Sequence, residues 1–413
     1  MKILVFGGTG KMGAVVAWDL ARQDEVEVVG IVGRRAEALK RTQQWINSEK
    51  VQIHPIDVSD KAKVTRLMKD YDVGVTTLPN RRTSYRVAEA AIEAGLPLVD
   101  ILEEYHRRPD PYETEGLEIP HGMSTEEYGE WLHERAIQAE ITFLSGIGFA
   151  PGISNVTLGE GIRKLDQAEI AVARVGGIPT KEAAARHPLR YITTWAFSHV
   201  LREYAVNVSV RKGGKIVEVK ALTDREQFRF TKFGKDEKLE CAITPGMPSF
   251  IYTHPELSEF AEKTIRWPGH YQGIDVLKEC GLLDLEPVEI DGTRIVPREF
   301  LLSLLEPKLQ PGPGETDVCV MWNTVTGMKD GRQARIDYYM WEEADQKNGI
   351  SAMARVTAFP AAIAAVFIGE GKIAKKGILA PEECIVGELY DDFIAELQKR
   401  NIVVLEETKL TDS

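Results

Sequence analysis

Cysteine is scarce in this sequence. Its 413 residues include 4 cysteines, Cys241, Cys280, Cys319 and Cys384, and no two of them have CxxC spacing. This pattern excludes a cysteine-ligated metal site and the dense disulfide framework of small secreted domains. We therefore expect no bound metal and a reducing compartment, the cytoplasm.

Long hydrophobic runs are absent as well. The longest, 358–369, contains Pro360 and falls well short of the roughly 20 residues that a membrane span requires. The first residues, MKILVFGGTG, pass from a short apolar stretch directly into glycines, whereas a signal peptide needs a longer apolar core and a cleavage site. We expect neither a membrane segment nor an export signal.

Basic residues are fewer than acidic residues in this sequence. Lys and Arg number 51 against 63 Asp and Glu, which gives a formal net charge of −12. A net negative field repels phosphate backbones and anionic lipid, so we expect neither nucleic acid nor membrane as a partner. The 43% hydrophobic and 28% charged residues are typical of a globular protein, and the length predicts about two or three domains.

Up to about residue 145, short β-branched runs alternate with longer amphipathic segments. The runs are KILVF, VEVVGIV, VQIHPI, DVGVTTL, LPLVD and ITFL. Strands that alternate with helices predict a parallel sheet covered on both faces, the doubly wound α/β Rossmann fold. We predict this domain over residues 1–150, with a loop insertion at about 103–135.

The pattern changes after GIGFAPGIS to segments of period 2, AEIAVARV, VNVSVRK, GKIVEVKAL and FRFTKF. DVCVMWNTVTGM and QARIDYYMW flank the turn residues 329–332 and predict a hairpin. These segments predict a second, α+β domain with a mainly antiparallel sheet over 151–350, which would bind the substrate. The segments 360–371 and 390–399 predict helices within 351–413 that return to the first domain.

A glycine-rich segment follows the first predicted strand. Gly8, Gly10 and Gly13 have GxGxxG spacing directly after KILVF and at the start of a helix, the context of a dinucleotide fingerprint. Gly8 would form the tight turn, Gly10 would let the backbone approach a pyrophosphate, and Gly13 would pack the helix on the strand. A glycine-rich turn without a ligand is the alternative. The predicted cofactor-binding residues here are Gly8, Thr9, Gly10, Lys11, Met12 and Gly13.

The end of the second predicted strand favours one cofactor. Arg34 and Arg35 stand where an acidic residue would bind the ribose 2′-hydroxyl of NAD, and two guanidiniums suit a 2′-phosphate instead. We therefore predict NADP, with NAD as the second candidate; the alternative is that both arginines are solvated charges at a helix start. Asp57, Leu78 and Pro79 follow the next two strands and are predicted to line the same cofactor crevice.

Motifs spread over nearly the whole chain resemble those of a known family. They are GGTGKMG, DVGVTTLP, VAEAAIEAGLPLVD, GIGFAPGISN, VGGIP, KTIRWPGH, VPREFLLSLLEP, MARVTAFPAAIA and GILAPEE. The chain resembles the saccharopine dehydrogenase family, which includes saccharopine reductase, carboxynorspermidine dehydrogenase and, most similar in these motifs, bacterial lysine 6-dehydrogenase. The resemblance implies an NAD(P)-dependent dehydrogenase or reductase that transfers hydride at a carbon–nitrogen bond of an amino acid, opine or polyamine derivative, in a homodimer formed through the second domain.

Two other functions stay open. A lysine 6-dehydrogenase-like oxidative deaminase would release ammonia, and an NADP-binding redox sensor would keep the fold without turnover. The insertion at 104–134, which contains His106, His121 and His133, is longer than in lysine 6-dehydrogenases and argues against a lysine-only substrate.

Hydride transfer from an amine requires an acceptor for the ammonium proton and a clamp for the carboxylate. In KTIRWPGH, Arg266 offers a planar fork for a carboxylate, and His270 titrates near neutrality. Asp100, at the carboxyl end of LPLVD, is a further candidate for the proton. We predict these three as catalytic residues; the alternative for His270 is a structural turn in which it caps backbone carbonyls.

Two further segments are predicted to bind the substrate. In GFAPGISN, a helix that begins near Gly152 would present N–H groups to a carboxylate, with Asn155 beside it; an interdomain turn with a capped helix explains the same residues. Through the resemblance, Tyr191 and Trp195 line the substrate pocket, with core packing as the alternative. The predicted substrate-binding set is Gly152, Asn155, Tyr191, Trp195, Arg266 and His270.

Overall fold

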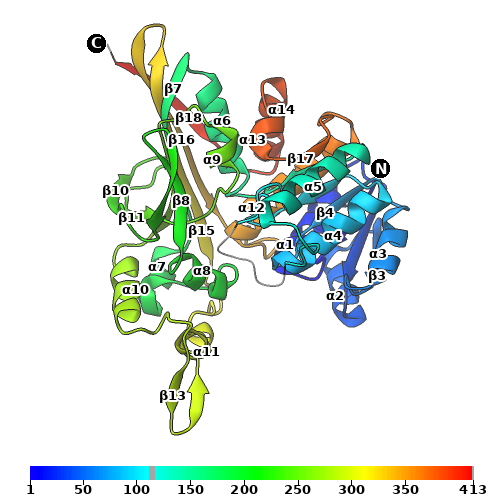
Figure 1. The fold of residues 1–413 in the computed structure, drawn as a ribbon, viewed down its shortest axis with the longest axis horizontal. Coiled ribbons are helices and arrows are strands. Elements are labelled where there is room, and N and C mark those ends of the chain that lie inside the picture. The colour runs from blue at the N-terminus through cyan, green and yellow to red at the C-terminus, as the bar shows by residue number, and fades with distance from the viewer. Residues whose placement is uncertain (111–116, 412–413) are drawn as a thin grey trace. The chain divides into compact units, whose positions relative to one another are not determined.

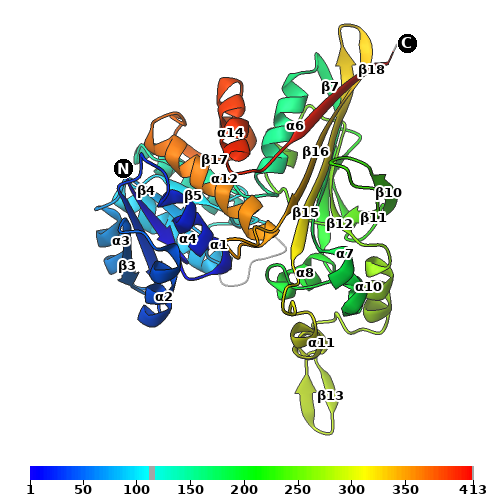
Figure 2. The same ribbon diagram turned by 180° about the vertical axis from the view of Figure 1, so that it is seen from behind.

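The computed structural model describes residues 1–110 and 117–411, which divide into two compact units. Figure 1 labels the helices and strands of both units, and Figure 2 shows them from behind. Each unit is described by itself. Unit 1 comprises Met1–Lys164, Gly246–Pro255 and Ala354–Ile402, and unit 2 comprises Leu165–Pro245, Glu256–Met353 and the chain from Val403 onward.

Unit 1 is built on a parallel sheet. Among the residues that the structure describes, this sheet has 7 strands in the order β17-β6-β5-β4-β1-β2-β3. The strands predicted up to residue 145 are all present, and the order confirms the doubly wound Rossmann arrangement, with its switch point between β1 and β4. The strands are β1 (Lys2–Phe6), β2 (Val28–Gly33), β3 (Val51–Pro55), β4 (Val73–Thr76), β5 (Leu98–Asp100), β6 (Thr142–Ser145) and β17 (Gly377–Leu379).

The central strands form because their residues are apolar on both faces. All four residues of β4, Val73–Thr76, are buried, as is β1 after Lys2. Parallel strands covered by helices on both sides are expected to lack a polar face. Besides one long helix described below, the helices of unit 1 are α1 (Lys11–Leu20), α2 (Ala36–Ile46), α3 (Lys61–Met68), α4 (Arg81–Ala94), α5 (Thr125–Gln138), α6 (Ile153–Arg163), α9 (Phe250–Thr253), α13 (Pro381–Cys384) and α14 (Glu388–Lys399).

The predicted loop insertion at about 103–135 is wrong in its second half, because α5 begins at Thr125. Ser124 and Glu127 form a capping box: the Glu127 N–H donates to Ser124 Oγ at 3.2 Å, and the Ser124 N–H donates to Glu127 Oε2 at 2.7 Å. This S-x-x-E signal stands in the sequence and predicts a helix start. Residues 111–116 of the predicted insertion lie outside the described residues.

The helix predicted at 360–371 is longer than expected. It is α12 (Ala352–Gly369), with Pro360 inside it. Of the helices in the described part of the chain, α12 is the one with the length and mean hydropathy, 1.7, that would suffice to cross a membrane, and 78% of it is buried inside the protein. A helix that is apolar on all sides is typical of a protein core as well as of a membrane span.

Unit 2 contains the second sheet. Its 9 strands, counted over the described ranges, follow the order β10-β11-β12-β7-β15-β16-β18, with β8 beside β12 and β9 beside β8. All pairings are antiparallel except β12 with β7, which agrees with the predicted mainly antiparallel α+β domain. The strands are β7 (Gln167–Pro179), β8 (Asn207–Lys212), β9 (Lys215–Lys220), β10 (Glu226–Phe230), β11 (Glu237–Ile243), β12 (Glu259–Arg266), β15 (Asp317–Lys329), β16 (Arg332–Glu343) and β18 (Leu405–Thr411).

The predicted hairpin is the longest pairing of this sheet. Lys329 pairs with Arg332 across the two-residue turn Asp330-Gly331, whose φ values of 50° and 71° are both left-handed, as a type I′ turn requires. A separate hairpin consists of β13 (Val288–Ile290) and β14 (Thr293–Ile295). The helices of unit 2 are α7 (Lys181–Arg186), η1 (Pro188–Arg190), α8 (Phe197–Glu203), α10 (His270–Glu279), α11 (Pro297–Leu305) and η2 (Glu306–Lys308).

The compact units have other bounds than the predicted domains. Unit 1 continues past residue 150 to Lys164, because α6 is buried almost throughout and contacts α13 in unit 1. The segment 351–413 does not return to unit 1 as a whole, because β18 pairs with β16 of unit 2. Strand β17 was also not predicted as part of the first sheet; it pairs with β6.

Candidate active site

The glycine-rich turn lies between β1 and α1. The sequence pattern predicts the tight turn at Gly8. In the structure Gly7 has the left-handed conformation instead, with a φ of +78°. A Cβ on Gly8 would lie 2.7 Å from Ile31 Cβ of β2, and one on Gly13 would lie 2.3 Å from the Gly7 carbonyl oxygen. Gly8 and Gly13 therefore serve close packing of the turn and of α1.

The start of α1 suits a pyrophosphate. Gly10 caps this helix without a side chain, and the N–H groups of Thr9, Lys11 and Met12 donate no hydrogen bond to another residue in the described ranges. Free N–H groups and the positive end of the helix dipole form an anion site. The residues present thus fit the dinucleotide that the sequence predicts.

The arginines predicted to select NADP follow β2 directly. Both Arg34 and Arg35 are exposed, and neither forms an ion pair with a carboxylate of the described residues. Asp57 follows β3, and the Ser59 N–H that donates to its carboxylate at 2.9 Å holds the pKa of Asp57 below its usual range, with a smaller contribution from Arg34. Leu78 and Pro79 follow β4 at the switch point, half-buried and exposed respectively. The guanidiniums of Arg34 and Arg35 are therefore available to pair with a 2′-phosphate.

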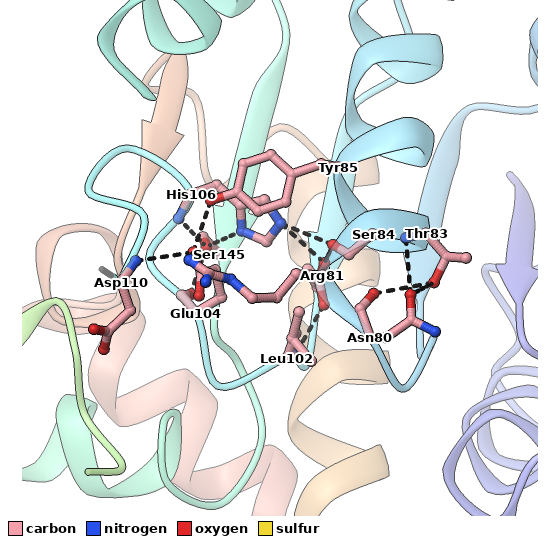
Figure 3. A network of polar contacts seen from close by, with 11 residues as sticks. Asn80, Arg81, Thr83, Ser84, Tyr85, Leu102, Glu104, His106, Asp110 and Ser145 are labelled. Carbon is pink, nitrogen blue, oxygen red and sulfur yellow. Dashed lines mark hydrogen bonds and ion pairs between the residues drawn. The ribbon is translucent and has the colours of Figure 1, made fainter. Parts of the chain in front are cut away.

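A buried polar network lies at the carboxyl ends of β5 and β6 (Figure 3). Asp100 ends β5, and its Oδ2 forms a short hydrogen bond with the Ser84 hydroxyl of α4. Ser84 Oγ also lies 2.8 Å from His106 Nε2, and His106 Nδ1 lies 2.8 Å from Ser145 Oγ at the end of β6. All four side chains are buried. The structure thus joins the predicted Asp100 to three residues that the sequence did not identify as partners.

The hydrogen-bond partners in this network determine which side-chain atoms carry a proton. The Ser145 hydroxyl donates to the Glu104 carbonyl at 2.9 Å, so it accepts from His106 Nδ1. His106 Nε2 then accepts from the Ser84 hydroxyl, and Ser84 in turn accepts from a protonated Asp100. Burial raises the pKa of Asp100 to about 7 and lowers the pKa of His106 to about 3, which agrees with a neutral acid beside a neutral imidazole.

Replacing Asp100 by asparagine is expected to change the pH dependence of stability. Because its pKa is raised from 3.8 to about 7, the folded chain keeps a proton that the unfolded chain releases, and the free energy of unfolding falls as pH rises through this window. The loss is on the order of 4 kcal/mol and is absent in D100N. Thermal unfolding of both chains between pH 4 and 7 measures it; a constant difference between the two curves would contradict the assignment.

A buried ion pair anchors the segment after β5. Arg81 Nη2 lies 2.6 Å from Glu104 Oε1, and the Tyr85 hydroxyl donates to the same oxygen at 2.7 Å (Figure 3). Burial raises the pKa of Glu104 and the Arg81 charge opposes this effect. Glu104 thus fixes the backbone next to His106.

In unit 2, the predicted clamp Arg266 ends β12 and is buried. Its Nε donates to the Tyr204 hydroxyl at 2.9 Å, and its Nη1 donates to the Ile265 carbonyl at 2.9 Å. Within the described ranges, no carboxylate forms an ion pair with it, and Nη2 donates no hydrogen bond. A buried guanidinium without a counterion is costly, so this site favours an anionic ligand.

His270, predicted as the base, is the first residue of α10 and is fully buried. Its Nδ1 lies 2.8 Å from the Leu189 carbonyl and its Nε2 lies 3.0 Å from the Tyr204 hydroxyl. A carbonyl only accepts, so Nδ1 donates and Nε2 accepts from Tyr204, which accepts from Arg266. Burial and the Arg266 charge lower the pKa of His270 to about 3. The geometry therefore argues against a base and makes His270 a positioning residue for Arg266, as in the structural alternative.

The two predicted aromatic residues differ in their surroundings. Tyr191 is buried, with the Arg266 guanidinium carbon 5.3 Å from its ring centroid and the His270 ring centroid at 5.6 Å. Trp195 is half-buried, and its ring contacts His199 at 5.9 Å between centroids. Tyr191 therefore lies beside the predicted clamp.

Gly152 and Asn155 have partners within unit 1. Asn155 Oδ1 accepts from the Gly152 N–H at 3.0 Å, and its Nδ2 donates to Ser249 Oγ at 3.1 Å and to Glu382 Oε2 at 3.0 Å. Gly152 has a φ of +134°, and a Cβ there would lie 1.9 Å from the Gly148 carbonyl oxygen. The amide of Asn155 is thus engaged by the protein, which favours the capped turn over the predicted substrate contact.

No group of three or more His, Cys, Asp or Glu side chains is placed to hold a metal ion within residues 1–110 and 117–411.

Comparison with known proteins identifies both halves of the chain. Residues 3–143 match the saccharopine dehydrogenase NADP binding domain, and residues 148–403 match the saccharopine dehydrogenase C-terminal domain. A carboxyaminopropylagmatine dehydrogenase of Synechocystis is 22% identical over 96% of this chain and 95% of its own length. A carboxynorspermidine synthase of Vibrio cholerae is 24% identical over 91% of each chain.

A solved structure has the same fold. The apo, L-glutamate-forming saccharopine dehydrogenase of Saccharomyces cerevisiae superposes with a TM-score of 0.77 at 20% identity and covers 99% of both chains. These findings confirm the predicted fold class, the nicotinamide-dependent oxidoreductase and NADP as cofactor. The chain therefore belongs to the saccharopine dehydrogenase family and is an NADP-binding oxidoreductase that acts on carbon–nitrogen bonds of amino-acid or polyamine substrates.

Proposed function

We propose that this chain interconverts a secondary amine and an imine on a carboxylate-bearing amino acid or opine. The observation that carries the proposal is the buried Arg266 guanidinium, which forms no ion pair with a carboxylate of the described residues. Both relatives reported above are named for carboxyl-bearing amines. A substrate carboxylate would supply the missing counterion.

The residues of unit 1 hold the cofactor in this proposal. The turn from Gly7 to Gly13 binds the pyrophosphate through N–H groups, and Arg34 with Arg35 binds the 2′-phosphate. Asp57, Leu78 and Pro79 line the cofactor crevice. The bound nicotinamide supplies or accepts the hydride.

Asp100 and Arg266 have separate tasks. An amine gives up hydride from its carbon only when its nitrogen lone pair is free, so the ammonium proton must leave first. With a pKa of about 7, Asp100 is partly ionised near neutral pH, and in this carboxylate form it accepts the ammonium proton. Arg266 holds the carboxylate, with its orientation set by Tyr204 and His270.

Nicotinamide absorbance tests the function. We expect NADP⁺ to be reduced with saccharopine or carboxynorspermidine, and the imine-forming components to oxidise NADPH in the reverse direction. Ammonia as a product would instead indicate a lysine 6-dehydrogenase-like deaminase. If NADPH binds and none of lysine, saccharopine and carboxynorspermidine changes its absorbance, the non-catalytic redox sensor is favoured.

Replacing His270 by glutamine is expected to leave the acid limb of the kcat/KM profile in place. A group with a pKa near 3 does not titrate between pH 5 and 8, so it contributes no step there. The substitution should raise KM, because Tyr204 loses its partner and Arg266 its fixed orientation. Disappearance of an acid-limb step in H270Q would restore His270 as the base.

We also propose a cytoplasmic homodimer that takes part in amino-acid metabolism. The family resemblance supports a dimer, and apolar side chains exposed on β13 and α11, among them Ile290 and Phe300, suit an interface. Light scattering on the purified chain measures the mass; a monomer at micromolar concentration would contradict the dimer.

A further inference from the structure

A short segment of unit 2 buries hydroxyl groups that lack partners. Tyr191, Thr193 and Thr194 lie between η1 and α8 with exposed fractions of 0%, 7% and 5%. Within the described ranges, none of the three hydroxyls makes a hydrogen bond of normal geometry. Each such group costs about 1–3 kcal/mol, and folded proteins contain few of them. Three within four residues indicate that a ligand supplies the partners.

The side chains that carry two of these hydroxyls, Tyr191 and Thr194, lie near Arg266. Arg266 Nη1 lies 3.5 Å from the Gly177 carbonyl, and a Cβ built on Gly177 would lie 3.5 Å from Thr194 Oγ1, so both side chains border the same glycine. Tyr191 lies under the guanidinium, at 5.3 Å from ring centroid to Cζ. Burial raises the pKa of Tyr191, and the Arg266 charge and a weak hydrogen-bond interaction with the neighbouring Thr194 hydroxyl oppose this rise. In the described residues, no such contact links the Thr193 side chain to Arg266 or Tyr191.

The acidic side chains near this site form no ion pair with Arg266 in the described ranges. Burial, assisted by Glu203, raises the pKa of Glu262 well above its usual range, and the Arg266 charge opposes this rise. Glu262 is also engaged by the Thr244 hydroxyl, which donates to it at 3.2 Å. The site therefore keeps the positive charge of Arg266 and two hydroxyl donors.

We infer that Tyr191 and Thr194 donate hydrogen bonds to the substrate carboxylate held by Arg266, and so determine specificity for an α-amino acid over the corresponding amine. A carboxylate offers about four lone-pair sites, enough for the Nη2 group and both hydroxyls. An ammonium would be repelled by the guanidinium, and a neutral group would leave its charge uncompensated. The inference rests on the proposed function, whose carboxylate site it completes.

Binding of matched ligand pairs tests the inference. The probes are L-lysine with 1,5-diaminopentane, L-glutamate with 4-aminobutyrate, and L-alanine with ethylamine, each pair differing in the α-carboxylate. Calorimetric titration of the full chain should show at least one amino acid bound about 10-fold or more tightly than its amine. This ratio should fall by about 10-fold in Y191F and in T194V, because each loses a hydrogen bond to a charged group.

Thr65→Val is the matched control. Thr65 lies on α3 of unit 1, and its hydroxyl also lacks a partner in the described part of the chain, so T65V makes the same chemical change elsewhere. Its ratio should equal that of the parent. Should Y191F fail to fold, the isosteric T194V decides the question.

Two results overturn the inference: a ratio in T194V and Y191F equal to that of the parent, or a parent chain that shows no preference for any of the three amino acids. The proposed function fails separately. Carboxylate-selective binding without nicotinamide turnover would contradict the proposed function and support the carboxylate site. Turnover with unchanged affinity ratios in both variants would support the proposed function and contradict the role of Tyr191 and Thr194.

Discussion

The Arg266→Met chain should lose about 10³-fold in kcat/KM while binding NADPH as the parent does. Methionine fills a similar volume but offers no N–H donor, and removing one partner of a buried charged contact costs about 2–5 kcal/mol. The free protein should become more stable, because the buried cation of Arg266 has no carboxylate partner among the described residues and apolar replacement removes its desolvation cost. Steady-state kinetics and thermal unfolding measure the two effects.

Arg225→Met is the control for this change. Arg225 is in unit 2 as well, but it is exposed and pairs with Asp275 at 2.6 Å, so its loss should leave kcat/KM unchanged. If R266M lowers kcat/KM no more than R225M does, Arg266 does not bind the substrate. A lower melting temperature in R266M would indicate a structural role instead.

The second large effect is expected from Arg34→Asp combined with Arg35→Ser. NADPH should bind about 100-fold more weakly, because two charge-assisted contacts to the 2′-phosphate are lost and a carboxylate is introduced beside it. NADH, which lacks that phosphate, should bind nearly as well as before. Quenching of tryptophan fluorescence by each nucleotide gives the two affinities.

The matched control for this double variant is Arg41→Ser, which removes an exposed charge from α2 beyond the end of β2. It should change the NADPH to NADH ratio little. Equal weakening of both nucleotides in the double variant would show that Arg34 and Arg35 act on the fold of the turn and not on the phosphate.

The first sheet was predictable because its chemistry is local. Strands buried on both faces must be apolar along their whole length, so β1 and β4 are recognisable without a partner. The glycine spacing likewise follows from one turn. Even there the left-handed φ falls on Gly7, because the spacing alone does not tell which glycine turns and which packs.

The state of the titratable groups was not predictable. His270 was interpreted as a base from its intrinsic pKa, but the fold buries it and brings Arg266 near, and both lower that pKa. Asp100 was identified by its place at a strand end, whereas its partners Ser84 and His106 come from other segments. Such neighbours are set by the tertiary fold, which residue spacing does not encode.

The two units interrupt each other along the chain, and this order constrains synthesis on the ribosome. The glycine-rich turn of unit 1 lies near the start of the chain, whereas the edge strand β17 of the same unit ends only at Leu379. Unit 2 receives its own edge strand, β18, from Leu405–Thr411. In a nascent chain, β6 and β16 therefore remain edge strands until translation is nearly finished, and truncation before Leu405 would leave the long strand β16 at the edge of the second sheet.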